Sequence, residues 1–509
     1  MNASWIIAPI LLPAVAAPLL ILLRLKDHAV RRGVSVAASV ALLAIAAGLY
    51  GLASDGQPRA YLLGAWEAPF GIVLVLDRLS ATMVLLTAIL ALLVNVYACA
   101  GWDRRGKHFH SLFQFQLMGI NGAFLTGDVF NLFVFFEVML IASYGLMLHG
   151  GGARRITAGF QYVAINLLGS VLFLIAVSLM YNVTGTLNMA DLAVRAPLTS
   201  EGNVALLKVS ALLLFLVFAT KAALAPMHWW LPTAYSAASA PAAALFAIMT
   251  KVGAYCIIRV YSLIFGADAG PVTHLAAPWI MPAAIATLVL GAIGALASRS
   301  LAGLIVFAVL WSMGTLLAAL AGFDQAGLSA ALYYAIHSTF AAAALFLIAD
   351  LILERRGGVG ALVTAPPMAQ AVLMGSVFFA AAVSMSGMPP LSGFIGKLLV
   401  LDATRGAALG AWVWTAVLIT SLAIIIAFAR AGSLLFWKAE TVAADAKPAV
   451  ATSLPALVCV LVLVTMTGLL SVFAGPVTRH MDAAAAQALD REAYVRAVLG
   501  RSPTQIAER

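Results

Sequence analysis

Long apolar stretches recur along the whole chain of 509 residues, and they constrain its fold more than any other feature. A helix needs about 20 mostly apolar residues to cross a bilayer, and on that criterion the sequence predicts about fourteen spans. Only 10% of the residues are charged, against about a quarter in soluble domains. The sequence therefore predicts an all-α polytopic membrane protein and excludes a soluble fold. The expected spans cover residues 5–23, 33–53, 71–99, 111–127, 130–149, 158–181, 205–225, 241–264, 277–297, 301–321, 327–353, 371–402, 410–436 and 450–474.

Charged residues in the loops between these spans alternate in number. The odd-numbered loops carry 15 basic residues and the even-numbered loops carry three. Because short cytoplasmic loops are enriched in Lys and Arg, the alternation predicts a multi-pass protein of the inner (plasma) membrane. The odd loops then face the cytoplasm, and both termini lie outside it. This bias also explains most of the net charge of +9 without a nucleic-acid partner.

The C-terminal segment from residue 478 to 509 is the largest polar piece of the chain. Its stretch Met481–Leu499 fits either an amphipathic helix at the membrane surface or a solvated tail.

Cofactor motifs are missing from the sequence. Cys99, Cys256 and Cys459 are isolated within apolar runs, so an iron–sulfur cluster or structural zinc is not expected. The chain also lacks a P-loop and a dinucleotide-binding glycine motif. We therefore expect no cofactor and no redox chemistry in this chain.

Five ionisable residues interrupt the apolar spans: Glu137, Lys221, Lys251, His337 and Lys397. A charge near the bilayer centre costs a few kcal/mol, and such residues usually face a bundle interior on an ion or proton route. The alternative is a set of buried ion pairs that only fix helix packing. We interpret the carboxylate and the three lysines as functional, whereas a neutral histidine satisfies itself locally more easily.

Five other charged residues lie nearer the predicted span ends. Helix-end and snorkelling positions need no functional explanation, so we expect these residues to be structural. They are Asp128, Lys208, Arg259, Asp350 and Asp402.

The basic residues deep in the spans are lysines, and this choice suits proton transfer. A buried lysine exchanges between amine and ammonium at modest cost, whereas arginine stays protonated. A carboxylate near the lysine favours the ammonium, so closing or opening a Glu–Lys pair loads or unloads a proton.

Two of the spans contain helix breakers beside a lysine. The seventh reads TKAALAPMHWWLPTAY around Lys221, and the twelfth reads MSGMPPLSGFIGK before Lys397. Proline removes a helix hydrogen bond, and irregular backbone at membrane depth is tolerated only where it is buried or lines a cavity. Paired broken helices in two halves of a chain mark transport sites built from inverted repeats.

These stretches, together with FEVMLIASYGLM and YYAIHSTF, resemble the antiporter-like subunit family. The family comprises proton-translocating membrane subunits of respiratory complex I and the large subunits of Mrp-type cation/proton antiporters. The resemblance covers residues 70 to 435, and within the family the chain is most similar to the D-type subunits of Mrp (Pha) antiporters. It implies two inverted repeats of five helices, with helices 7 and 12 broken.

The resemblance also implies domain boundaries. Residues 1–110 would hold helices 1–3, 111–264 the first half-channel, 277–436 the second, and 450–509 helix 14 with the tail.

Roles for individual residues follow from the same resemblance. Glu137 and Lys221 would be the carboxylate–lysine pair of the first half-channel, Lys251 the central relay and Lys397 the terminal lysine of the second. His337 and, with less support, His228 match family histidines. Some relatives carry a further lysine where this chain has Ala341, so the link from Lys251 to Lys397 would depend on His337 and water.

Three functions are compatible with these features. The first is a membrane component of a hetero-oligomeric Na⁺ or K⁺/proton antiporter. The second is a proton-pumping component of a complex I-like NADH:quinone oxidoreductase or membrane hydrogenase. The third is a scaffold component that transports nothing. No group of oxygen-bearing side chains marks a cation site, and Asp128 is a weak candidate.

Overall fold

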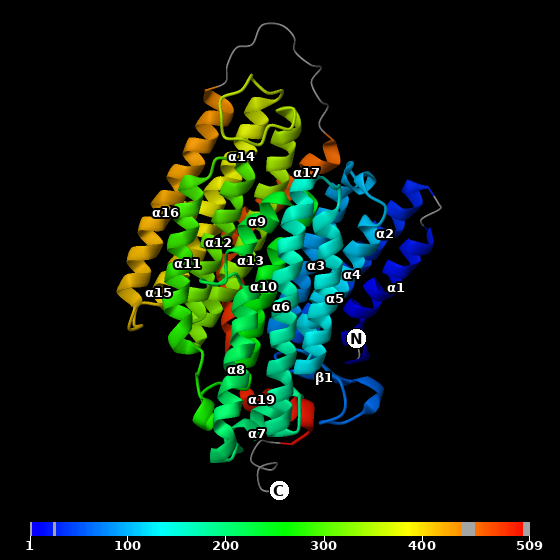
Figure 1. Cartoon of the computed structure of the whole chain (residues 1–509), viewed down its shortest axis with the longest axis vertical. Coiled ribbons are helices and arrows are strands. Elements are labelled where there is room, and N and C mark those ends of the chain that lie inside the picture. The colour runs from blue at the N-terminus through cyan, green and yellow to red at the C-terminus, as the bar shows by residue number, and fades with distance from the viewer. Residues whose placement is uncertain (1–2, 24–26, 439–452, 502–509) are drawn as a thin grey trace.

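The computed structural model describes residues 3–23, 27–438 and 453–501, and it consists almost entirely of helices that run along one long axis (Figure 1). Nineteen α-helices and one two-stranded antiparallel sheet make up the described part of the chain. The elements are α1 Ala8–Leu22, α2 His28–Ala53, β1 Arg59–Leu62, β2 Val73–Leu76, α3 Arg78–Ala98, α4 Phe109–Leu125, α5 Val129–Leu148, α6 Ala153–Thr184, α7 Met189–Arg195, α8 Glu201–Lys221, α9 Trp230–Ala237, α10 Ala240–Leu263, α11 Ala277–Ala297, α12 Leu301–Leu320, α13 Gln325–Arg355, α14 Ala371–Ser386, α15 Ser392–Ala403, α16 Gly410–Gly432, α17 Leu454–Val472, α18 Ala474–Leu489 and α19 Arg491–Leu499.

All fourteen expected spans are present as helical segments, and the seventh and twelfth are broken as predicted. The breaks separate α8 from α9 and α14 from α15. Twelve helices of the described chain are long and apolar enough to cross a membrane; α14 is apolar but only 16 residues long. The first residues of the last expected span, 450–452, lie outside the described residues.

One boundary was predicted wrongly. Residues 73–76 form β2, which pairs with β1, so the third span begins at Arg78 and not at residue 71. A short apolar run before a helix has no periodicity that would distinguish strand from helix.

Glycine packing reveals the repeat within the bundle. A Cβ on Gly119 of α4 would lie 2.5 Å from the backbone nitrogen of Met139 in α5, and one on Gly291 of α11 would lie 2.5 Å from that of Trp311 in α12. Both glycines and both partners are separated by 172 residues, so α4–α10 and α11–α16 use the same close helix contact. Each repeat contains five spans, an odd number, so the second begins on the side opposite the first. The same offset relates Gly122 and Phe135 to Gly294 and Phe307.

The two ends of the bundle differ in charge. Basic residues of the first and third loops line one recess, and those of the fifth and ninth loops line another. We call the end of the bundle that holds these two recesses the basic end. The opposite end carries the sheet, α7 and α19 (Figure 1). The residues that precede α1 contact β1, and so does α19. The described chain therefore begins and finishes at the opposite end, as an even number of spans requires.

Two helices form the centre of the molecule. Every residue of α10 from Pro241 to Leu263 is buried, and most of α13 is buried as well. A helix that is apolar on all sides belongs in the interior of a bundle. The helices that carry Lys251 and His337 are therefore surrounded by other helices, whereas α1, α6 and α16 expose much of their surface.

The C-terminal segment is helical but packs on the protein. It forms two helices, α18 and α19, that meet at Asp490. Met481 and Ala485 are buried against the bundle, and α18 contacts α3, α10 and α13. The amphipathic pattern from Met481 to Leu499 thus marks a protein-facing surface.

Candidate functional site

Lys221 and Glu137 are held by two residues of α6 that stand one turn apart. The ammonium of Lys221 donates to the amide oxygen of Asn166, and the hydroxyl of Ser170 donates to Glu137. Lys221 is 6% exposed. Glu137 is within electrostatic range of Lys221, yet the two form no direct ion pair. The structure therefore brings the predicted pair together, with α6 as the bridge.

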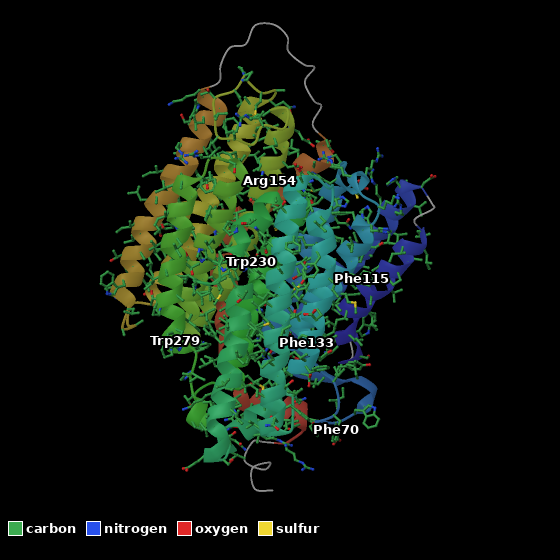
Figure 2. All side chains as sticks on the ribbon, in the orientation of Figure 1. Phe70, Phe115, Phe133, Arg154, Trp230 and Trp279 are labelled. Atoms are coloured by element: carbon green, nitrogen blue, oxygen red, sulfur yellow. The ribbon has the colours of Figure 1, made fainter. Side chains whose placement is uncertain are left out.

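Backbone groups that lose their helix partners at the break after Lys221 form hydrogen bonds with nearby side chains. Trp230 at the start of α9 donates its indole N–H to the carbonyl of Thr220, with 2.9 Å between the nitrogen and the oxygen. The backbone nitrogen of Ala225 donates to Thr287 Oγ1 on α11 at 2.8 Å. Figure 2 shows Trp230 near the middle height of the bundle. Backbone groups that leave a helix at membrane depth need such partners. Because these groups have them, the break is a stable feature of the fold.

Lys251 lies on α10 beside that break. Gly253, two residues on, packs against the chain at Ala222, where an added Cβ would be 2.5 Å from the backbone nitrogen. Lys251 is 1% exposed, and its Nζ has no hydrogen-bond partner among the described residues. A buried polar group without a partner is costly, and this distinguishes Lys251 from Lys221 and Lys397, whose ammonium groups donate to Asn166 and to Ser386.

Lys397 bridges the second break. Its ammonium donates to the carbonyl of Ser386, the last residue of α14, and to Ser421 Oγ of α16 at 2.7 Å. It also lies 4.5 Å from the ring centroid of Trp311 on α12. Gly387, with a φ of +69°, leaves room for it, since a Cβ there would be 2.7 Å from Lys397 Nζ. Four elements therefore position this one ammonium.

His337 of α13 lies beside the second break. Its Nδ1 is 2.9 Å from Ser392 Oγ at the start of α15, and its Nε2 has no partner among the described residues. The ring is within electrostatic range of both Lys251 and Lys397. An imidazole has one ring nitrogen that can accept a proton and one that can donate it, so His337 is a candidate for proton transfer.

His228 lies in the first break, away from these contacts. It is half-buried, and its Nδ1 is buried without a described partner. No hydrogen bond of the described residues joins its side chain to a lysine.

Three of the five charged residues near the span ends have partners of a structural kind. Arg259 pairs with Asp77 at 2.6 Å, and Asp350 accepts hydrogen bonds from Tyr97 and Trp102 at 2.8 and 2.6 Å. Asp128 caps α5 by accepting from the backbone nitrogen of Asn131 at 2.7 Å. Lys208 and Asp402 are not buried.

A second titratable cluster, which the sequence did not indicate, lies at the basic end. Ligand atoms of Cys99, Asp103 and His110 lie within 4.8 Å of one another. Arg32 binds both oxygens of Asp103, at 2.6 and 2.7 Å. Burial acts to raise the pKa of Asp103, but the hydrogen bonds and charges of Arg32 and His110 outweigh it and hold that pKa below its usual range. The cluster is an ion-paired joint between helices.

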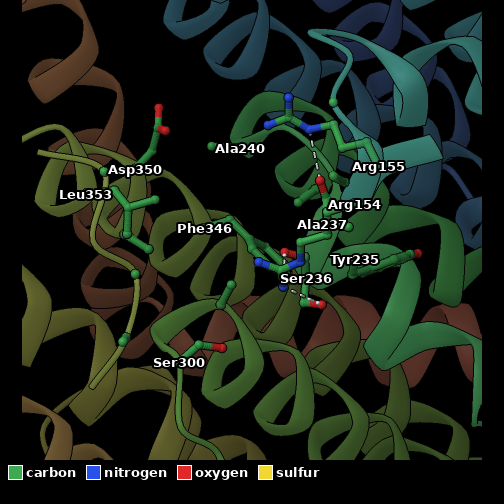
Figure 3. A pocket seen from close by; sticks show the side chains of 18 of the residues that line it. Arg154, Arg155, Tyr235, Ser236, Ala237, Ala240, Ser300, Phe346, Asp350 and Leu353 are labelled. Carbon is green, nitrogen blue, oxygen red and sulfur yellow. Dashed lines mark hydrogen bonds between the residues drawn. The ribbon is translucent and has the colours of Figure 1, made fainter. Parts of the chain in front are cut away.

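A recess of about 630 Å³ opens at the basic end. Figure 3 shows Arg154 and Arg155 on one side and Ser300 and Asp350 on the other. Arg155 donates to the carbonyl of Ala237 at 2.9 Å, so the recess lies over the carboxyl end of α9.

Four site residues escaped the sequence analysis: Asn166, Ser170, Ser392 and Ser421. Each is a small polar residue in an apolar helix. Such residues are common in helix interiors, where their side chains also bond to their own backbone, so the sequence gives no signal that separates them from packing residues.

Comparison with known proteins places the chain in a family. Residues 126–427 match the family model described as NADH:quinone oxidoreductase/Mrp antiporter, transmembrane. The chain is 41% identical to the D-type subunit of a probable K(+)/H(+) antiporter of Rhizobium meliloti, over 94% of both chains. It is 36% identical to the D-type subunit of the Na(+)/H(+) antiporter of Bacillus subtilis, over 97% of this chain and 99% of the relative.

Solved structures share the fold. A chain of the Mrp complex from Dietzia sp. DQ12-45-1b is 29% identical and superposes with a TM-score of 0.87 over 98% of this chain and all of that chain. A chain of respiratory complex I from Thermus thermophilus is 25% identical, with a TM-score of 0.80 over 95% of this chain and 99% of that one. The chain therefore belongs to the NADH:quinone oxidoreductase/Mrp antiporter transmembrane family.

Proposed function

We propose that this chain is the D-type subunit of a multisubunit monovalent cation/proton antiporter and that it moves protons through its buried lysines. The observation that carries the proposal is the set of ionisable groups, half-buried Glu137 and buried Lys221, Lys251, His337 and Lys397, at and near two helix breaks. Relatives of nearly full length, named as D-type antiporter subunits, support this function over the complex I-like alternative.

The proposed proton route runs from the first break to the second. A proton enters near Glu137, occupies Lys221, passes to Lys251 across the close contact at Gly253, and reaches Lys397 through His337. In each step the donor and acceptor lie on different helices, so small helix movements change the contact without breaking a helix. Each half of the route falls in one five-helix repeat, residues 111–264 and 277–436.

The exchanged cation is Na⁺ or K⁺. Relatives of both kinds have similar identity. Asp128 is a poor cation ligand here because its carboxylate caps α5. We therefore assign the proton route to this chain and a share of the cation route to partner membrane subunits of the complex.

The protein resides in the inner (plasma) membrane with its basic end toward the cytoplasm and its termini outside. The positive-inside rule supports this orientation, since the loops at the basic end hold most of the loop arginines.

The test is ΔpH-driven Na⁺/H⁺ and K⁺/H⁺ exchange in everted vesicles that contain the whole complex. Glu137→Ala and Lys221→Ala should abolish exchange, whereas Lys208→Ala, a lysine on the same helix outside the site, should leave it unchanged. Lys221→Arg should not rescue, because arginine does not release its proton. Normal exchange in the assembled Lys221→Ala complex would favour the scaffold function instead.

A further inference from the structure

One face of α10 forms a polar line from the centre of the bundle to its opposite end. Lys251, Tyr255 and Arg259 are spaced by four residues, which places them on the same helix face. A narrow cavity borders Lys251 and Tyr255 and also touches Met83 of α3 and Leu316 of α12. The line is thus a short way out of the membrane for a proton on Lys251, in a different direction from His337.

The donor and acceptor directions of the hydrogen bonds along this helix face block the movement of a proton along it. The hydroxyl of Tyr255 donates to the backbone carbonyl of Phe124 at 2.5 Å and accepts from Arg259, whose Nε is 3.3 Å away. Proton transfer along a chain of groups needs each group both to donate and to accept. Arginine has five donors and no acceptor, and it does not deprotonate, so the next group beyond Tyr255 cannot accept a proton from it.

Arg259 is fixed from the far side as well. Its guanidinium pairs with Asp77 at 2.6 Å, and both side chains are at most 4% exposed. Asp77 also accepts from the backbone nitrogen of Ser80 at 2.8 Å and so caps α3. The ring of Tyr494 from α19 lies 5.3 Å from the guanidinium carbon. The cation therefore has an anion on one side and an aromatic ring on another.

The C-terminal helices hold this arrangement in place. Gln487 of α18 accepts from the backbone nitrogen of Arg78 and donates to the carbonyl of Gly56, both at 2.8 Å. Arg491 donates to the carbonyl of Ala193 in α7. Contacts of this kind fix α19, and with it Tyr494, over the end of α10.

We propose that Tyr255, Arg259, Asp77 and Tyr494 form a proton plug that prevents Lys251 from losing its proton directly toward the opposite end. The inference rests on the proposed function, since it assumes that Lys251 carries protons. The plug would keep exchange coupled, because the proton on Lys251 could then leave only toward His337 and Lys397.

The test compares two double variants of the purified complex in liposomes. Asp77→Asn/Arg259→Gln replaces the ion pair by groups that donate and accept, and Asp77→Asn/Arg259→Met replaces it by an apolar block. Both keep the α3 cap and both remove the ion pair, so they share any structural cost. Proton leak is followed with an internal pH dye, with choline as the only monovalent cation and nitrate as a permeant counter-ion.

We expect the Gln variant to leak roughly tenfold faster than wild type, equivalent to a barrier lower by about 1.4 kcal/mol. The Met variant should stay near wild type, and adding Lys251→Met to the Gln variant should stop the leak. A wild-type leak rate in the assembled Gln variant, or equal leaks in both variants, would overturn the plug. Lys251→Met alone tests the function separately: if it retains exchange, the proton route is wrong, and if it loses exchange while the Gln variant does not leak, only the plug is wrong.

Discussion

Gly387→Ala tests whether the position of Lys397 matters for transport. Gly387 ends α14 in the left-handed region, at φ +69° and ψ +44°, which costs a residue with a Cβ about 1–2 kcal/mol. The added Cβ would also come within 2.7 Å of Lys397 Nζ and 2.8 Å of its Cδ. The end of a lysine is flexible, so the side chain swings away from the added Cβ, but it then leaves the carbonyl of Ser386.

A hydrogen bond to a charged group contributes about 1.5–3 kcal/mol, and each 1.4 kcal/mol is about a factor of ten in rate or population. We therefore expect Gly387→Ala to lower cation/proton exchange by roughly tenfold or more. Its unfolding temperature should fall by the backbone strain and by the loss of this hydrogen bond.

Gly185→Ala is the matched control. Gly185 ends α6 with a φ of +70°, and its added Cβ would meet its nearest atom, on Arg195, at an ordinary 3.6 Å. The control has the same backbone strain and no contact with Lys397. Exchange in everted vesicles and thermal unfolding of the solubilised complex are measured for both variants. Equal exchange in the two would refute the argument that Gly387 makes room for the Lys397 ammonium.

Two further predictions concern other parts of the site. Gly253→Ala should push α10 away from the break at Ala222, lower stability by about 1–3 kcal/mol and lower exchange. Gly169→Ala is the control, because Gly169 faces open space, and it should change neither. Equal behaviour of the two variants would argue against close packing at the break. Burial raises the pKa of Asp128 from 3.8 to about 6. The folded state therefore binds an extra proton between about pH 4 and 6, so stability falls by about 3 kcal/mol as pH rises through that window. Asp128→Asn keeps the cap and should flatten the dependence of thermal unfolding on pH, and an unchanged slope would contradict it.

The sequence alone was sufficient for the spans, the two breaks and the identity of the buried charges. Each span must form its own backbone hydrogen bonds within the bilayer, so the length and composition of a local stretch are enough to predict it. Lys221, Lys251 and Lys397 stand out for the same reason, because a charge in a long apolar run is costly wherever the run packs.

The partners of those charges were decided only by the tertiary structure. Asn166, Ser170 and Ser421 lie on other helices than the lysine or glutamate that they contact, 24 to 55 residues away in the chain. Their own neighbourhoods look like those of any polar residue in an apolar helix. The spacing of Lys251, Tyr255 and Arg259 in the sequence shows that they share one face of α10, but the sequence does not show the proton plug. It depends on Asp77 and Tyr494, which are 182 residues before and 235 residues after Arg259 in the chain, and only the packing of α3 and α19 around α10 brings them together.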